Sequence, residues 1–302
     1  MRLVMLTALL LAPACAPVAK PASAVVQSPA SVADSLLAAD RAFAAAAAGK
    51  PAAEALDAMI ADDVVMFIIP APTQARNRAE AQAIMGQVFA GDAVTLRWAP
   101  VRGGVSADGR HGFTYGFMDQ LVAGKPPKLG KYVAYWVRGA DGWRAASLKI
   151  VPRPDGDVAT AMREPALPDH LVAPTADAAV IESYRASLDK AERAFSDDSQ
   201  TIGLGAGFKK YGSADAMNVG GEADFVYGNV AIGAAQGGDA PNPSPLRWAP
   251  DGVVVSSSGD LGFTYGYLIR NGPTPPGRLA RIPWVTIWRR NSPSDPWLYV
   301  AE

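Results

Sequence analysis

The sequence predicts an α+β protein made of two copies of one unit, in each of which a sheet curls over helices. The first observation is an internal repeat, because "HGFTYGFM" at 111–118 returns almost unchanged as "LGFTYGYL" at 261–268. The second is the order of patterns within a unit, where helical patterns come first and most β-type patterns come last. The third is a proline-rich stretch between the two units.

The similarity extends far beyond that strand. Further matches keep the same order at an offset of 150 to 152 residues: "LRWAP" at 96–100 and 246–250, "VSADGRHGFTYGF" at 105–117 and "VSSSGDLGFTYGY" at 255–267, and "AADRAF" at 38–43 and "KAERAF" at 190–195. This period is much too long for a solenoid repeat. The chain therefore contains a duplicated domain of about 120 residues, which is an ordinary domain size.

The elements of the first unit follow from periodicity and residue type. Residues 33–48 are rich in alanine and place Leu36, Leu37 and Phe43 on one stripe, which predicts a helix. The β-branched residues of 62–69 predict a strand. Gly, Asp-Gly and Pro-Pro turns separate the other predicted elements, which are helices at 52–61 and 77–90 and strands at 94–99, 101–107, 111–121, 130–138 and 143–151.

The domain boundaries follow from the same patterns. The first repeat is predicted at 33–151 and the second at 180–302. Between them, 152–179 is rich in proline and has no apolar periodicity. Proline fixes φ and lacks a backbone donor, so this stretch is predicted to be an extended linker.

The N-terminus has the pattern of an export signal. One basic residue, Arg2, precedes an apolar run from Leu3 to Ala12, which matches a secretory h-region and is too short to cross a bilayer. Cleavage is expected either before Cys15, the only cysteine, which would then carry a lipid, or after Ala24. Residues 1–24 are thus a predicted signal peptide, followed by a tether to residue 32. The protein is expected in the periplasm or as a membrane-anchored lipoprotein of a bacterium.

Composition excludes several classes of protein. With 49% hydrophobic residues the chain can bury real cores. Its net charge of −1, without any run of Lys or Arg, predicts no nucleic-acid partner. His111 is replaced by Leu261 in the second copy and His170 lies in the linker, so no histidine dyad or metal cluster is predicted. We expect no catalytic residues, no metal and no cofactor.

Three further patterns have ordinary structural readings. His111, at the start of a strand, is expected to be exposed, and Asp62 and Asp63 are expected in a solvated turn. "GLGAG" at 203–207 follows a helix instead of a strand, so it is read as a helix-to-helix turn and not as a phosphate loop.

The sequence resembles the nuclear transport factor 2-like superfamily, and more narrowly its ketosteroid-isomerase and polyketide-cyclase-like bacterial domains. The succession "AFAAAAAGKPAAEALDAMIADDVVMF…RNRAEAQAI…GFTYGFM…YVAYWVRGADGWRAASL" carries this resemblance, and both copies share it. It implies two cone-shaped repeats, each with a curved mixed, mostly antiparallel sheet wrapped over its N-terminal helices. The fold implies no particular chemistry, because it serves isomerases, dehydratases, cyclases and binding modules.

A ketosteroid-isomerase-like site needs one carboxylate in the first strand of a unit and a second acid across an apolar cavity. The resemblance places these positions at residues that carry no acid: Phe67 or Ile68 and Val133 or Ala134 in the first copy, and Val219 or Gly220 in the second. Proton abstraction of that type is therefore not expected.

The repeated strand supplies the candidate ligand site. Its period of two places alternate aromatic residues on one face, which the resemblance turns into the cone. There the rings either fill the core or line a pocket. The pocket candidates are Phe113, Tyr115, Phe117 and Trp136 in the first copy and Phe263, Tyr265, Tyr267 and Trp288 in the second.

We expect an exported binding protein for a small apolar or amphipathic molecule, or an envelope protein with a structural role. The alternative is a lyase or isomerase that uses Tyr115 or Tyr265. The two repeats are expected to pack sheet against sheet as an intramolecular pseudo-dimer. Contact with a membrane is expected only through a lipid on Cys15. Trp98 and Trp248 are expected as core anchors or pocket floor, with Arg97 and Arg247 facing outward.

Overall fold

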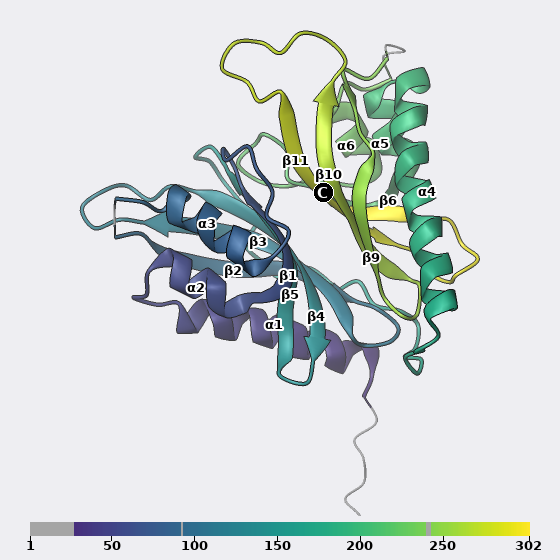
Figure 1. Cartoon of the computed structure of the whole chain (residues 1–302), viewed down its shortest axis with the longest axis horizontal. Helices are drawn as coiled ribbons and strands as arrows, with labels where there is room; N and C mark the ends of the chain where they lie inside the picture. The colour runs from purple at the N-terminus through teal and green to yellow at the C-terminus, as the bar shows by residue number, and fades with distance from the viewer. Residues whose placement is uncertain (1–26, 92, 240–242) are drawn as a thin grey trace, which may run out of the picture.

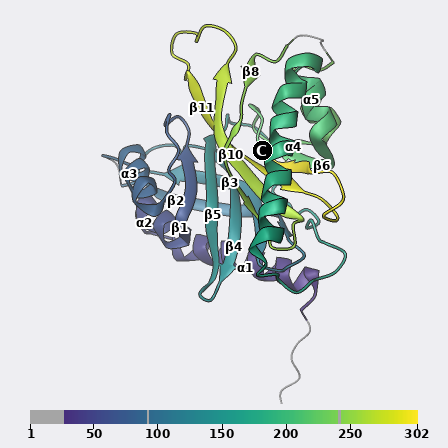
Figure 2. The same ribbon diagram turned by 45° about the vertical axis from the view of Figure 1, so that its right-hand side comes forward.

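The computed structural model describes residues 27–91, 93–239 and 243–302. Two sheets lie next to each other in the middle of the molecule, and the helices of each repeat cover the outer face of its own sheet (Figures 1 and 2). The predicted leader and Cys15 lie outside the described residues. Within the described part, no helix combines the length and the apolar character needed to cross a bilayer.

The first repeat forms a five-stranded mixed sheet of order β1-β5-β4-β3-β2, in which β1 and β5 run parallel and the other neighbours antiparallel. Ser28 begins the first helix, because its side chain accepts from Ser31 N and Ser31 bonds back to Ser28 N. The elements are α1 (Pro29–Ala46), α2 (Ala52–Met59), β1 (Ile60–Ile68), α3 (Arg78–Val88), β2 (Thr95–Val105), β3 (His111–Leu121), β4 (Gly130–Gly139) and β5 (Gly142–Pro152).

The second repeat keeps the same strand order, β7-β6-β12-β11-β10-β8, with β9 also paired to β10. β10 therefore occupies the place that β3 has in the first sheet. Its elements are α4 (Ala178–Ile202), α5 (Leu204–Tyr211), β6 (Gly212–Asn218), β7 (Val226–Tyr227), α6 (Asn229–Ala235), β8 (Leu246–Arg247), β9 (Pro250–Val255), β10 (Leu261–Arg270), β11 (Arg281–Arg289) and β12 (Leu298–Ala301). The predicted class is confirmed: α+β, with two mixed sheets, each preceded by helices.

One strand differs from its prediction. The strands expected at 94–99 and 101–107 are a single strand, β2, because a bulge between Pro100 and Arg102 absorbs the irregularity without ending the pairing to β3. In the second repeat the same stretch is divided into β8 and β9.

The prediction that the aromatic face of the repeated strand points into the cone, the space between each sheet and its own helices, is wrong. Phe113, Tyr115 and Phe263 point toward the other repeat and belong to one buried cluster that both sheets share. The ring of Phe263 lies 4.8 Å from that of Tyr135. We call this cluster the inter-sheet layer; its members on the central strands are Phe113, Tyr115, Phe117, Val133, Tyr135, Leu261, Phe263, Val285 and Ile287.

The glycines on the other face of the strand explain this orientation. A Cβ added at Gly112 would lie 2.5 Å from Leu36 Cδ2 of α1, and one at Gly262 would lie 2.7 Å from Leu188 Cδ2 of α4. The helix thus packs directly on the strand at these two positions, where larger side chains would not fit. The helix therefore packs on the face of small residues, and the face of large aromatic residues packs against the other sheet.

The hairpin turns of the two repeats bond reciprocally. The Asp108 carboxylate accepts from Ser257 N at 2.8 Å, and the Asp260 carboxylate accepts from Ala107 N at 2.9 Å. His111 lies beside this contact, with Nδ1 3.0 Å from Tyr135 Oη, and burial lowers the pKa of its imidazole. The expectation that His111 is exposed is therefore wrong, because the second repeat covers this strand start.

The linker is extended, but it is not a free tether. Arg163 N donates to Val101 O at 2.8 Å, Ala166 N donates to Gly103 O at 2.9 Å, and Val105 N donates to Ala166 O at 3.1 Å. The linker therefore covers the outer edge of β2 along 101–105.

We predict that Phe263→Ala lowers the free energy of unfolding by about 3–5 kcal/mol, because Phe263 is 1% exposed in the inter-sheet layer. Urea denaturation followed by tryptophan fluorescence and circular dichroism measures this. Both probes should show one shared transition, since the layer belongs to both sheets. Ile269→Ala, on the same strand at 37% exposure, should cost about 1 kcal/mol or less. Two separate transitions would contradict a shared core.

Candidate functional site

Each cone contains one fully buried carboxylate at an equivalent position on its first helix. In the first repeat, Asp40 Oδ1 accepts from Trp98 Nε1 at 2.8 Å and Oδ2 accepts from Tyr132 Oη at 2.7 Å. In the second, Glu192 Oε1 accepts from Trp248 Nε1 at 2.6 Å. Both tryptophans come from the repeated "LRWAP"; each is buried in the core of its repeat, and each also lines a pocket.

Glu192 has two more donors, Trp288 Nε1 at 2.9 Å and Thr264 Oγ1 at 2.5 Å. These hydrogen bonds favour the carboxylate form, but burial has the larger effect and raises the pKa of Glu192 to about 7. Burial likewise raises the pKa of Asp40 above its ordinary value. Glu192 is thus able to change its protonation state near neutral pH.

A cavity of about 130 Å³ lies in the cone of the second repeat. Its apolar walls are Leu204, Phe208, Leu246, Trp248 and Leu268. Its other lining residues are Trp284 and the polar residues Asn218, Gln236, Thr286 and Glu302. Helices, strands and loops of this one repeat enclose it.

Several lining side chains have hydrogen-bonding groups available, and one of them, Trp284 Nε1, is buried without a partner among the described residues. Asn218 Oδ1 accepts from Gly220 N at 2.8 Å, while no hydrogen bond within the described residues engages Asn218 Nδ2 or Thr286 Oγ1. Glu302 Oε2 is buried without a partner. Burial raises the pKa of the Glu302 side chain, and the positive charge of Lys149 from the first repeat opposes that rise. The cavity therefore offers an amide, a hydroxyl and a carboxyl that is easily protonated.

The first repeat has apolar residues at the equivalent positions. β1 pairs with β5 as β6 pairs with β12, so the neighbours Met66 and Leu148 correspond to Asn218 and Glu302. By the match of Trp136 to Trp288, Ala134 corresponds to Thr286. Met66, Ala134 and Leu148 are fully or almost fully buried in a continuous apolar core. The polar residues beside the cavity of the second cone thus have apolar, buried counterparts in the first.

None of the eight predicted pocket residues lines this cavity. Phe113, Tyr115, Phe117 and Phe263 lie in the inter-sheet layer, and Tyr265 packs against it. The Tyr267 hydroxyl accepts from Gln74 N of the first repeat at 3.0 Å. Trp136 and Trp288 lie inside their cones, where Trp136 Nε1 donates to Thr114 Oγ1 at 2.8 Å.

The sequence contained one unused signal for the site. Aligning "AADRAF" with "KAERAF" places Asp40 opposite Glu192, an acid kept among apolar helix residues in both copies. Asn218 directly precedes Val219, one of the positions at which a carboxylate was sought. Glu302 and Thr286 belong to no recognisable motif. The one signal for them is that each is polar where the aligned residue of the first copy is apolar.

The remaining candidates have simple positions. Asp62 and Asp63 are exposed as expected, but they lie within β1 and not in a turn, and Asp62 pairs with Arg78 at 2.8 Å. Gly203 joins α4 to α5, but the rest of "GLGAG" already belongs to α5, so the helix-to-helix turn is a single residue. No group of three or more His, Cys, Asp or Glu in the described ranges could hold a metal ion.

No protein-family model and no curated protein matches the chain. Solved structures do match. A ketosteroid isomerase-like protein from Erwinia carotovora atroseptica is 16% identical over 39% of this chain and 95% of its own, with a TM-score of 0.34. An NTF-2 like protein of unknown function from Shewanella oneidensis is 10% identical over 39% and 97%, with a TM-score of 0.33. ActVI-ORFA from Streptomyces coelicolor is 22% identical over 39% and 95%, with a TM-score of 0.31.

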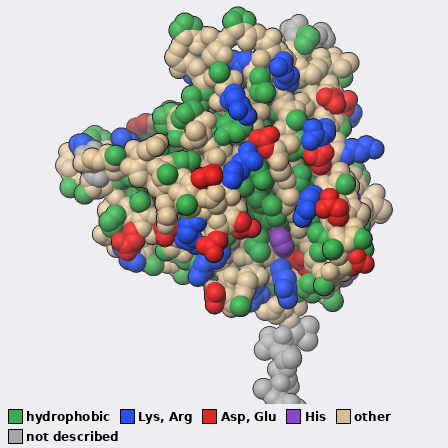
Figure 3. Space-filling view, in the orientation of Figure 1, with side chains coloured by type: hydrophobic (Ala, Val, Ile, Leu, Met, Phe, Trp, Pro, Cys, Tyr) green, Lys and Arg blue, Asp and Glu red, His purple; other side chains and the backbone are tan. Residues whose placement is uncertain are grey.

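These similarities concern the fold. In each repeat the mixed, mostly antiparallel sheet preceded by helices agrees with the expectation from the resemblance to the nuclear transport factor 2-like superfamily. On the face drawn in Figure 3, acidic and basic side chains are interspersed.

We predict that Glu192 makes stability depend on pH. Because its pKa rises from 4.5 to about 7 on folding, the folded chain binds more protons than the unfolded chain between these values. Its contribution is fully present below pH 4.5 and is lost as the pH rises through 7, by on the order of 3 kcal/mol.

Urea denaturation from pH 4.5 to 8 measures this contribution as the difference in slope between the wild type and Glu192→Gln, which should have the flatter profile. Glu182→Gln, at an exposed position of the same helix, should keep the wild-type slope. Equal slopes for the wild type and Glu192→Gln would contradict the assignment.

Proposed function

We propose that the second repeat binds a small, uncharged, amphipathic molecule in its cone and that the first repeat serves as its scaffold. The main support is the contrast between the two cones. Asn218, Thr286 and Glu302 surround a cavity in one, whereas apolar side chains fill the equivalent positions in the other. Glu302 Oε2 is buried without a partner among the described residues, which costs stability unless a ligand or water supplies one.

The size of the cavity limits the ligand. At about 130 Å³ it is close to the roughly 150 Å³ that accommodates benzene in a protein interior. It is well below the roughly 300–1,000 Å³ of pockets for drug-sized ligands. A molecule with one small ring or a short branched chain matches this volume, and the leucine, phenylalanine and tryptophan walls favour an apolar body.

The polar side of the cavity favours an uncharged ligand with a carbonyl or hydroxyl group. The raised pKa of Glu302 supports a neutral carboxyl that both donates and accepts. Asn218 Nδ2 adds a donor, and Thr286 Oγ1 can act in either role. A charged ligand would lose its hydration in this enclosed site without a fixed counter-charge of its own.

Nothing in the cavity favours the lyase or isomerase alternative. The tyrosines that it would use, Tyr115 and Tyr265, lie at the inter-sheet layer, on the opposite face of their strands. Binding without turnover is therefore the function we propose.

Exchanging the cavity residues for those of the first repeat tests this function. We predict that Asn218→Met, Thr286→Ala and Glu302→Leu together weaken binding at least about tenfold, as expected for the loss of one or two net hydrogen bonds. Isothermal titration calorimetry with phenol and with cyclohexanone measures this.

Met66→Leu, in the apolar cone, is the matched control and should bind like the wild type. Native mass spectrometry of protein from its own cells should also show a small bound molecule. Wild-type protein that binds neither probe, or a triple variant with unchanged affinity, would refute the proposal.

We further propose that residues 1–24 direct export. Arg2 and the apolar run from Leu3 to Ala12 support this. N-terminal sequencing of the protein from envelope fractions should find a start at Cys15 or at Val25. Label from a fatty-acid analogue that disappears in Cys15→Ser would identify the lipoprotein form. Protein that starts at Met1 in those fractions would contradict export.

A further inference from the structure

β2 is an edge strand, and only half of its outer edge is covered. The linker pairs with residues 101–105, while Thr95–Pro100 has no neighbouring strand on that side among the described residues. On the neighbouring strand β3, Gln120 directs both its N–H and its C=O away from β2 and bonds with Lys128, at 2.9 Å each. Leu96 lies opposite Gln120 and therefore forms no backbone hydrogen bond with it. Because bonded and non-bonded pairs alternate along an antiparallel ladder, the backbone groups of Leu96 and of Trp98 face outward, away from β3.

The second repeat shows how this edge can be closed. The N–H of Trp248, which corresponds to Trp98, donates to Ser196 Oγ at 3.0 Å. The C=O of Leu246, which corresponds to Leu96, accepts from Gln200 Nε2 at 2.9 Å. Both side chains come from α4. The helix of the second repeat thus satisfies the edge of its own sheet.

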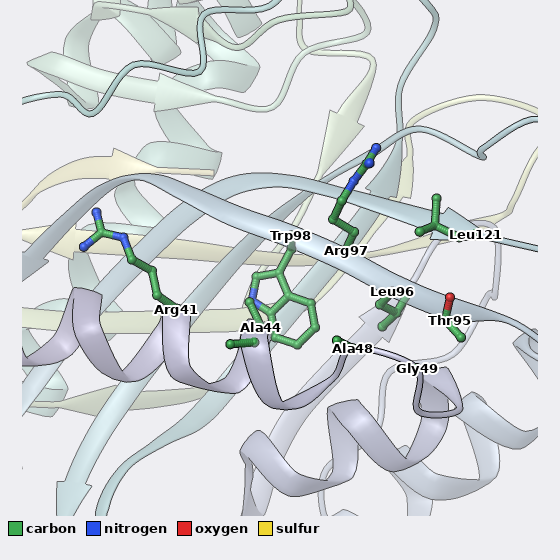
Figure 4. Close-up of a pocket in the computed structure, with 10 residues that line it drawn as sticks. Arg41, Ala44, Ala48, Gly49, Thr95, Leu96, Arg97, Trp98 and Leu121 are labelled. Atoms are coloured by element: carbon green, nitrogen blue, oxygen red, sulfur yellow. The ribbon is translucent and has the colours of Figure 1, made fainter.

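In the first repeat the two aligned positions are alanines, one within α1 and the other in the turn that follows α1. The match of "AADRAF" to "KAERAF" equates Ala44 with Ser196 and Ala48 with Gln200. Alanine has no group that could reach the strand. Among the described residues, the N–H of Trp98 and the C=O of Leu96 therefore have no outer partner. A groove of about 530 Å³ lies between α1 and β2 instead, with Ala44 and Ala48 below Trp98 and Leu96 (Figure 4).

The groove is positively charged. Arg41 from α1 and Arg97 from β2 line it, and none of its lining residues is acidic. In Figure 4 both side chains extend upward, away from the alanines. Arg97 is exposed and pairs with Asp119 at 2.9 Å, while Arg41 has no ion pair within the part of the chain that the structure describes. An acidic ligand would thus be attracted to the rim.

We propose that this groove binds an extended, acidic peptide segment of a partner protein, which joins the first sheet as a further strand beside Thr95–Pro100. One residue of a parallel peptide would accept from the N–H of Trp98 and donate to the C=O of Leu96. The linker already adds to the neighbouring part of this edge in the same manner, through Ala166. The arginines select acidic side chains next to these backbone contacts.

The experiment closes the groove with the residues that the second repeat uses. The probe is a capped pentapeptide of sequence EVTVE, and calorimetry measures its binding to the full chain. Ala44→Ser with Ala48→Gln should weaken binding at least about tenfold, because two backbone hydrogen bonds are lost to the helix. Its thermal unfolding should match that of the wild type. Arg41→Glu with Arg97→Glu should also weaken the binding of EVTVE, and this variant should bind KVTVK more tightly than EVTVE.

Three outcomes would overturn the proposal. The first is equal affinity of EVTVE for the wild type and for the Ala44→Ser, Ala48→Gln variant. The second is equal affinity of the wild type for EVTVE and KVTVK. The third is a wild-type dimer in sedimentation that the Ala44→Ser, Ala48→Gln variant dissolves, because the occupant would then be a second copy of this chain.

Discussion

The packing of the two sheets against each other determines how each repeat is built. Each central strand has one face of large aromatic residues and one face of glycine and threonine. A buried aromatic side chain removes about 150–250 Å² from water, worth several kcal/mol. In each repeat the helices cover only one face of the sheet, and Leu36 and Leu188 show that this is the glycine face, because they pack directly on the strand there. The aromatic faces therefore need each other, and the cones are left to the helices.

The interiors of the two cones take no part in this contact, so their side chains can differ between the repeats. Asp40 and Glu192 keep the same role, accepting hydrogen bonds from the tryptophan of "LRWAP" deep inside each unit. Around them, one unit fills its interior with apolar side chains while the other keeps polar ones at a cavity. The edge strands differ in the opposite sense, because the second unit closes its edge with Ser196 and Gln200. The two repeats thus differ both at the cavity of the second and at the edge groove of the first.

The sequence predicted the duplication, the fold class and most element positions because these depend on local periodicity and on spacing between matches. The direction of the aromatic face could not be read in the same way. A period of two separates "GFTYGF" into two faces without saying which one meets the helix; that depends on how closely Leu36 approaches Gly112. The proximity of Asn218 and Glu302 could not be predicted from the sequence either, since it depends on the register of β6 against β12. His111 was misjudged because the covering hairpin lies about 150 residues further along the chain.

The covalent linker has a consequence for how such a molecule can change. In a homodimer of identical chains, every substitution appears in both subunits, so a polar residue in a cone would burden both cores. Here the two units are encoded separately and joined by a segment that is itself hydrogen-bonded to β2. One unit can acquire a carboxyl or an amide while its neighbour keeps the apolar version. Fusion thus allows a symmetric architecture to carry asymmetric sites.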